Sequence, residues 1–256
     1  MPGGKFDSSL TRVVPVFERL KARGGDWVRA LLHSATGGHP DAKIENSLDL
    51  SFQRGFWGNK EQGLRPPAAL LTWLVTNPHR LRERVSANAD RQKLLACEPE
   101  AIAKACRLLA EQPASRAWYV FERYTYPDAV IYTPDAIVVV EGKRTEAGPT
   151  VNTSWLAGRH QIWRHIDAAW EIREKRHVYG LFLVESVAGG VPTVWRDAAA
   201  NTVRDDVLAS SLPHRTQGEA DEVSRCFLGA CDWQSLCTQA GLDAASLPRT
   251  TDDIHS

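Results

Sequence analysis

The segment from Asp128 to Lys143 constrains the fold most, because it holds two apolar, β-branched runs separated by a short turn sequence. DAVIY and AIVVVEGK have the composition of β-strands, and Thr-Pro-Asp lies between them. Proline presets the backbone for the first corner of a turn, and Asp135 suits the next position. The segment therefore predicts a β-hairpin in which Asp135 is a turn residue and belongs to no site.

The open end of this hairpin carries charged side chains. Asp128 begins the first run, and Glu141 and Lys143 follow the apolar part of the second. A hairpin of this length brings Asp128 level with Glu141 on a neighbouring strand about 5 Å away. Glu141 and Lys143 are two residues apart, so the alternation of a strand points both to one face. The two carboxylates can then share one cation.

The flanking sequence predicts a three-part chain. Over residues 1–95, apolar residues recur at steps of three and four, which predicts a mainly helical region. Gly-rich connectors are expected at 37–47 and 53–66. The middle part reads as a helix (98–112), three strands (117–125, 128–132 and 136–144), a helix (159–175) and a strand (177–186). Helices are expected at 205–212 and 218–242, and the tail 247–256 has too little apolar surface to become ordered.

Pro127-Asp128, followed by Glu141-Gly142-Lys143, resembles the PD-(D/E)xK signature of the restriction-endonuclease-like nucleases. The α-β-β-β-α-β order over residues 98–186 resembles the core of that superfamily. The resemblance implies an α/β protein with a nuclease-like core at 96–190. An N-terminal helical region (1–95) and a C-terminal helical extension (191–246) would flank the core.

The resemblance also implies a function and a set of site residues. The function is metal-dependent hydrolysis of DNA phosphodiester bonds, with Mg²⁺, or Mn²⁺ in its place, held by Asp128, Glu141 and the main-chain carbonyl of Gly142. Lys143 would orient the attacking water and stabilise charge on the phosphate, and Gln161 would position the water or a ligand. The third acid would be Glu122 or one of two acids on the preceding helix, Glu100 and Glu111.

Any nucleic-acid contact must come from a local patch, because 31 basic residues balance 31 acidic residues. The helix after the hairpin offers such a patch. The expected nucleic-acid-binding residues are Arg144, Arg159, Arg164 and His165, with His160 nearby.

Ordinary alternatives stay open for every one of these residues. Asp128 suits a turn, Glu141 and Lys143 suit a solvated strand end, and the polar side chains of the helix, Gln161 included, suit its wet face. Two other functions also remain: a nucleic-acid-binding or assembly module with an idle metal site, and an RNA-directed nuclease. A protein partner or a homodimer is compatible with each.

The five cysteines are odd in number and irregularly spaced, so they predict reduced thiols rather than a disulfide framework. One cysteine before the core and three after it is also the arrangement of iron–sulfur relatives of RecB-type nucleases. The trailing C-x4-C-x5-C lacks a C-x2-C step, so buried helix thiols are expected instead of a cluster. The sequence shows no secretory signal and no apolar run of about 18 residues, which predicts a cytoplasmic protein without a membrane contact.

Overall fold

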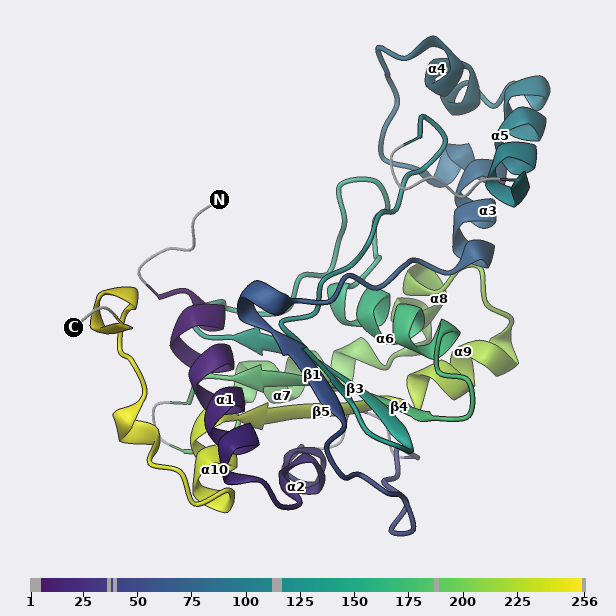
Figure 1. The fold of residues 1–256 in the computed structure, drawn as a ribbon. Coiled ribbons are helices and arrows are strands. Elements are labelled where there is room, and N and C mark those ends of the chain that lie inside the picture. Colours follow the sequence, from purple (N-terminus) through teal and green to yellow (C-terminus); the bar gives the residue numbers. More distant parts are fainter. Residues whose placement is uncertain (1–5, 36–37, 39–40, 112–116, 187–188, 255–256) are drawn as a thin grey trace.

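The computed structural model describes residues 6–35, 38, 41–111, 117–186 and 189–254, which form a mixed α/β fold (Figure 1). The strands are β1 (Arg54–Trp57), β2 (Ala129–Tyr132), β3 (Ala136–Lys143), β4 (His177–Val184) and β5 (Phe227–Asp232). The helices are α1 (Val14–Arg23), α2 (Trp27–His33), α3 (Ala68–Thr76), α4 (Ala89–Leu95), α5 (Pro99–Glu111), α6 (Gln161–Glu171), α7 (Thr193–Thr202), α8 (Asp205–Ser211), α9 (Gln217–Ser224) and α10 (Trp233–Gln239). Throughout these ranges, every helix is too short or too polar to cross a lipid bilayer.

The five strands form one sheet in the order β1-β2-β3-β4-β5. β2 pairs antiparallel with both β1 and β3, whereas β4 pairs parallel with both β3 and β5. The parallel step from β3 to β4 needs a crossover connection, and α6 provides it. The hairpin strands therefore lie inside the sheet, with a partner on each side.

The predicted hairpin is confirmed. Ala129 lies opposite Val140, and Tyr132 lies opposite Ile137. At the turn, the Thr133 backbone N–H donates to the Ala136 carbonyl at 2.9 Å. Asp135 is a turn residue, as expected, and its carboxylate accepts a hydrogen bond of 2.7 Å from the Asp49 backbone N–H.

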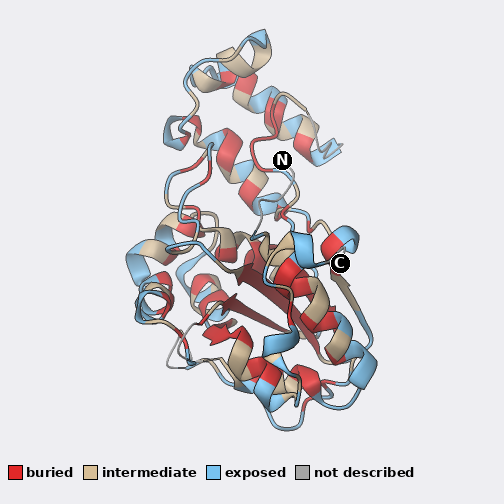
Figure 2. Ribbon diagram, turned by 90° about the vertical axis from the view of Figure 1, so that its left-hand side faces the viewer, coloured by how far each residue is buried: buried red, intermediate tan, exposed pale blue. Residues whose placement is uncertain are grey.

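Helices cover both faces of the sheet, and each face has its own apolar core (Figures 1 and 2). On one face α1, α2 and α10 pack against alternate strand residues such as Val138, Val140 and Leu181. On the other, α6 to α9 pack against Val139 and Phe182. Burial on both sides explains why β3 and β4 read as almost continuous apolar runs.

A helical lobe is inserted in the chain between the paired strands β1 and β2. We define the helical lobe as residues 64–111 and 117–125, which contain α3, α4 and α5. Its ends meet at one point, because the backbone N–H groups of Leu64 and Thr125 each donate to the other's carbonyl, at 2.8 and 2.9 Å. Figure 1 shows the three helices standing away from the sheet. They bury a third apolar core, which also receives Trp155 and Leu156 from the loop after β3.

Several expected elements are wrong. The expected strand at 117–125 is not formed, and the third antiparallel strand is instead β1, within the expected connector 53–66. The helix at 99–111, expected to be the first element of the nuclease-like core, lies instead in the helical lobe. The expected helix 218–242 is divided into α9, β5 and α10, and α7 was not predicted.

The tail from residue 247, expected to lack order, contains regular structure. Residues Thr251–Ile254 form a 3-10 helix. The carbonyls of Pro248 and Arg249 accept hydrogen bonds from Arg12 and Arg144, at 2.6 Å each. Residues 255 and 256 of this tail lie outside the described part of the chain. The remaining expectations about the three-part division of the chain stay predictions.

Candidate active site at the open end of the hairpin

The structure brings Asp128, Glu141 and Lys143 together at the open end of the hairpin. Asp128 directly precedes β2, whose first residue lies opposite Val140, so Asp128 stands beside the Glu141–Gly142 step of β3. The Gly142 backbone N–H donates to Asp128 Oδ2 at 2.7 Å. The Lys143 ammonium lies 2.7 Å from Glu141 Oε1. Two carboxyl groups and one ammonium therefore lie side by side at this end of the hairpin.

The carboxyl group of Asp128 is strongly perturbed. Burial raises its pKa to about 8, and the neighbouring Glu141 adds to the rise, while the Gly142 N–H and Lys143 oppose it. The local positive charge is thus too small to keep Asp128 ionised at neutral pH. A buried acid that is short of positive charge is a frequent feature of functional sites.

Glu141 and Lys143 hold each other in their charged forms. Burial alone would raise the pKa of Glu141, but its contacts with His165 and Lys143 outweigh burial and lower it. Burial alone would lower the pKa of Lys143, but Glu141 outweighs burial and raises it. Lys143 is consequently a protonated cation at neutral pH, suited to charge stabilisation and not to accepting a proton.

Glu61 is a third acid near this group and was not expected from the sequence. It follows the 3-10 helix Gly58–Lys60 after β1. Burial raises the pKa of Glu61, and the negative charge of Glu141 raises it further. Glu61 in turn contributes to the raised pKa of Asp128. Glu61 thus interacts electrostatically with both expected ligands, although the helical lobe separates Glu61 from them along the chain.

The chemistry of these residues fits an oxygen-preferring divalent cation. Asp128, Glu141 and Glu61 supply carboxylate oxygens, the donors that Mg²⁺ prefers. Burial, and after it the charge of Glu141, raises the pKa of Asp128 and of Glu61, and a bound cation would favour the ionised form of both. In the described ranges, no three ligating side chains already form a closed metal-binding group. Gly142 adjoins the acids through its backbone, and the role of its carbonyl stays a prediction.

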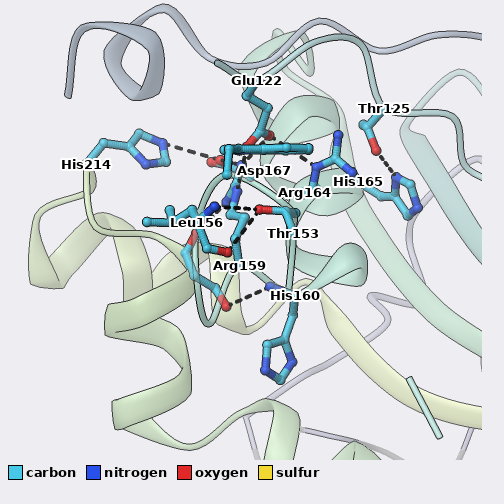
Figure 3. Close-up of polar contacts among 12 residues, drawn as sticks. Glu122, Thr125, Thr153, Leu156, Arg159, His160, Arg164, His165, Asp167 and His214 are labelled. Atoms are coloured by element: carbon cyan, nitrogen blue, oxygen red, sulfur yellow. Dashed lines mark hydrogen bonds and ion pairs between the residues drawn. The ribbon is translucent and has the colours of Figure 1, made fainter. Parts of the chain in front are cut away.

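Glu122 is not a ligand of this group, which corrects the expected third acid. Its carboxylate lies 3.0 Å from the Arg159 guanidinium and 3.4 Å from that of Arg164, and it also accepts from the Trp155 indole N–H (Figure 3). The other two acids weighed for this role, Glu100 and Glu111, are carried by α5 in the helical lobe. Glu122 is buried and balances the charges of Arg159 and Arg164. Its strand-like sequence context does not reveal these two partners.

Arg159 does not face a ligand, in contrast to the expected role in nucleic-acid binding. Its side chain is 0% exposed, and its guanidinium lies 3.0 Å from both Glu122 and Asp167. It also donates to the Ser211 carbonyl at the end of α8. Figure 3 shows this buried network between the segment before α6 and the C-terminal helices. Arg159 therefore has a structural role.

His165 is also buried, and the expected role in nucleic-acid binding is wrong. Its Nε2 lies 2.9 Å from Glu141 Oε2, and its Nδ1 lies 2.7 Å from the Thr125 hydroxyl. Burial lowers the pKa of His165 and outweighs the opposing effect of Glu141. The neutral ring is then oriented by Thr125 and fixes Glu141, as the outer partners of metal ligands do.

The other basic residues differ in accessibility. Arg144 is 9% exposed, donates to the Thr11 hydroxyl at 2.8 Å and lies 3.7 Å from Glu185, so it links the two ends of the chain instead of facing a ligand. Arg164 is 15% exposed and lies over the Trp155 ring at 4.8 Å. Arg164 alone among the four expected nucleic-acid-binding residues lines a large cavity.

Gln161 is half-buried at the start of α6, where its backbone N–H donates to the Thr150 carbonyl at 2.9 Å. Its catalytic role stays a prediction. The adjacent His160 has a buried Nδ1 that meets no hydrogen-bond partner in the described residues, and burial lowers its pKa.

The three trailing cysteines lie at β5 and α10, not on one helix as expected. Cys231 is in β5, Cys226 directly precedes it and Cys237 is in α10. Burial raises the pKa of Cys226 and Cys231 to about 12 and that of Cys237 to about 11. All five cysteines are free thiols. At neutral pH the three trailing thiols are protonated and weakly reactive.

Comparison with known protein families, curated proteins and solved structures finds no match to this chain.

Proposed function

We propose that this protein is a metal-dependent nuclease that hydrolyses DNA phosphodiester bonds. The observation that carries the proposal is the convergence of Asp128, Glu141 and the protonated Lys143 at the open end of the β2–β3 hairpin. The element order supports it: with α2 and the lobe helices left out, α1-β1-β2-β3-α6-β4 follows the α-β-β-β-α-β pattern that the resemblance implies, in partly different segments. The inserted helical lobe then lies between the first two strands.

The site residues have distinct roles in this proposal. Asp128, Glu141 and Glu61 would hold a divalent cation, which supplies hydroxide near neutral pH and offsets the charge growing on the phosphate. Lys143 would orient the attacking water and stabilise a phosphate oxygen through its ammonium. His165 keeps the Glu141 carboxylate in place. A cavity of about 490 Å³ is lined by Glu61 and Tyr126, and it would be the side from which a substrate approaches Glu61.

The test is cleavage of plasmid and single-stranded DNA with Mg²⁺ or Mn²⁺. We expect Asp128→Asn, Glu141→Gln and Lys143→Ala each to lose at least about 100-fold in rate. Asp128→Asn keeps an acceptor for the Gly142 N–H, so its melting temperature should stay near that of the wild type. Asp135→Asn, at the opposite end of the same hairpin, is the matched control and should retain activity.

Two results would count against the proposal. Cleavage that survives both Asp128→Asn and Lys143→Ala would show that the chemistry lies elsewhere. DNA binding without cleavage under every metal would favour the binding or assembly module. An RNA substrate in the same assay separates a DNA nuclease from an RNA nuclease, since phosphodiester chemistry at this site is common to both.

A further inference from the structure

A large cavity lies between the helical lobe, the loop after β3 and α6, and the proposed chemistry does not use it. Its volume is about 1130 Å³, above the range of about 300–1,000 Å³ that is usual for small-molecule pockets. Its wall includes Arg82 from the segment between α3 and α4, residues of the 117–124 segment, the 152–155 loop and Arg164 of α6. The cavity is therefore built jointly by the lobe and the core.

The cavity is strongly positive in a chain of zero net charge. Four arginines line it: Arg82, Arg91, Arg123 and Arg164. Two of them have carboxylate partners, because Glu83 pairs with Arg91 at 2.6 Å and Glu122 lies 3.4 Å from Arg164. Arg82 and Arg123 are exposed, and neither forms an ion pair with any described residue. Two unpaired guanidiniums facing one cavity indicate an anionic ligand with several charges.

Aromatic rings accompany these arginines. Tyr124 and Trp155 are half-buried and line the cavity, so part of each ring is accessible. Tyr126, 55% exposed, continues the series, and a Cβ on Gly63 would meet the rings of both tyrosines within 3.0 Å. Guanidiniums for phosphates and rings for bases are the two components of sites for unpaired nucleic-acid strands.

The cavity is connected to the candidate active site by adjacent residues. Tyr124 lines the cavity, Thr125 contacts His165, and Tyr126 lines the smaller hollow beside Glu61. Arg164, in the cavity wall, directly precedes His165, which contacts Glu141. A strand seated in the cavity and passing over the two tyrosines therefore reaches the hollow beside Glu61, the third acid of the proposed site.

We propose that this cavity binds an unpaired stretch of nucleic-acid strand and delivers it to the hairpin acids, an inference that rests on the proposed nuclease function for its substrate. In a duplex the base faces are stacked on one another and cannot reach recessed rings. Unpaired bases present those faces freely. The substrate class is thus single-stranded nucleic acid, or the single-stranded part of a branched or frayed duplex.

The test measures binding of a labelled single-stranded DNA oligonucleotide by fluorescence anisotropy, in a metal chelator so that no cleavage occurs. Arg82→Gln/Arg123→Gln should raise Kd at least about tenfold at moderate salt. Loss of two phosphate contacts should also reduce the slope of log K against log salt by about 1.4. Tyr124→Leu should weaken binding without changing this slope.

The matched control is Arg107→Gln/Arg196→Gln, which removes the same charge from two exposed arginines outside the cavity wall. It should bind like the wild type. Unchanged binding by the Arg82/Arg123 variant would overturn the inference, as would duplex DNA bound as tightly as the single strand. An RNA oligonucleotide with the same dependence on Arg82 and Arg123 supports it, since phosphates and base faces are shared.

The inference and the proposed nuclease function fail in different ways. Binding that depends on Arg82 and Arg123 without cleavage under any metal supports the cavity and rejects the nuclease. If cleavage requires Asp128 but binding is unchanged when both arginines are replaced, the nuclease function is supported and the role of the cavity is rejected.

Discussion

Thr125, His165 and Glu141 are joined by two buried hydrogen bonds in series. Since burial lowers the pKa of His165, the ring is neutral at pH 7 and carries one N–H. A carboxylate can only accept, so Nε2 carries the proton toward Glu141, and Nδ1 accepts from the Thr125 hydroxyl. The threonine therefore selects the tautomer that holds a proposed metal ligand in place.

Thr125→Val should weaken Mg²⁺ activation by about 10–100-fold, because Nδ1 loses the hydrogen-bond donor that orients the ring. Thr125→Ser keeps the hydroxyl and should restore wild-type behaviour. The measurement is the Mg²⁺ concentration for half-maximal cleavage. Thr238→Val, which removes an exposed helical hydroxyl, is the control. If the serine variant were as impaired as the valine variant, packing and not the hydroxyl would explain the loss.

Asp167 makes stability depend on pH in the acid range. Burial would raise its pKa, but His214, Arg159 and Arg215 outweigh burial and lower it to about 2. Because the folded pKa lies below the unfolded value of 3.8, the stabilisation is present above about pH 4 and is lost as pH falls toward 2. A shift of nearly two pKa units at about 1.4 kcal/mol per unit corresponds to about 2 kcal/mol.

We therefore expect urea denaturation to show a loss of about 2 kcal/mol between pH 5 and 2 that Asp167→Asn does not show. At pH 7 the same variant should be less stable by about 3–5 kcal/mol, because Arg159 remains buried without one of its two carboxylates. Asp197→Asn, on the exposed side of α7, serves as the control. Equal acid sensitivity of wild type and Asp167→Asn would assign the effect to other groups.

The elements that depend on local chemistry could be predicted from the sequence, and those that depend on distant partners could not. The hairpin follows from its own turn and β-branched strands, so Asp128 and Glu141 were placed correctly. β1 is four residues long in a Gly-rich stretch and exists because it pairs with β2. β5 pairs with β4, but its Gly and Cys residues between two helices gave no strand pattern.

Burial by distant segments explains the misassigned polar residues. Arg159 looks like a solvent-facing helix residue until Glu122 from the lobe and Ser211 from α8 enclose it. Similarly, only the adjacency of β1 and β2 brings Glu61 near the hairpin acids. A short acid-bearing connector after a strand is a weak signal, and no local pattern in the sequence selects this acid.

At Gly180 of β4, Ile166 of α6 packs directly against the sheet backbone. A Cβ there would lie 2.4 Å from Ile166 Cγ1 and 2.5 Å from its Cδ1. Gly180→Ala should therefore force α6 outward, lower stability by about 1–3 kcal/mol and reduce cleavage, since His165 directly precedes Ile166. Chemical denaturation and the cleavage rate measure both effects.

A double variant with Ile166→Ala isolates this contact. The added methyl then has room, so the two losses of stability should sum to more than the loss in the double variant. Gly218→Ala is the matched control, because a Cβ at this exposed helical glycine meets nothing within 4 Å. It should be neutral or slightly stabilising. Additive losses at positions 180 and 166 would contradict the proposed clash.

The molecule as a whole has two cores on the sheet and a third in the helical lobe, and the lobe joins the remainder of the chain at few points. The lobe core consists of residues from α3, α4, α5 and the 117–121 segment, plus Trp155 and Leu156 from the loop after β3. The other junctions are the paired residues Leu64 and Thr125 and the ion pairs of Glu122 with Arg159 and Arg164. The lobe core should therefore be able to open without the sheet, as locally stable units do.

Leu74→Ala, in the lobe core, should cost about 2–5 kcal/mol locally and accelerate hydrogen exchange in α3, α5 and the 152–156 loop, while β3 and β4 keep wild-type protection. Leu181→Ala, buried in the interior strand β4, should reduce protection everywhere, because opening the sheet unfolds the whole chain. The measurement is exchange resolved by peptide. Equal loss of protection in β3 and the lobe for Leu74→Ala would contradict separate opening. If the two open separately, Leu74→Ala should also weaken binding of single-stranded DNA without altering a single side chain of the cavity wall, since the lobe holds Arg82 and Arg123 in position.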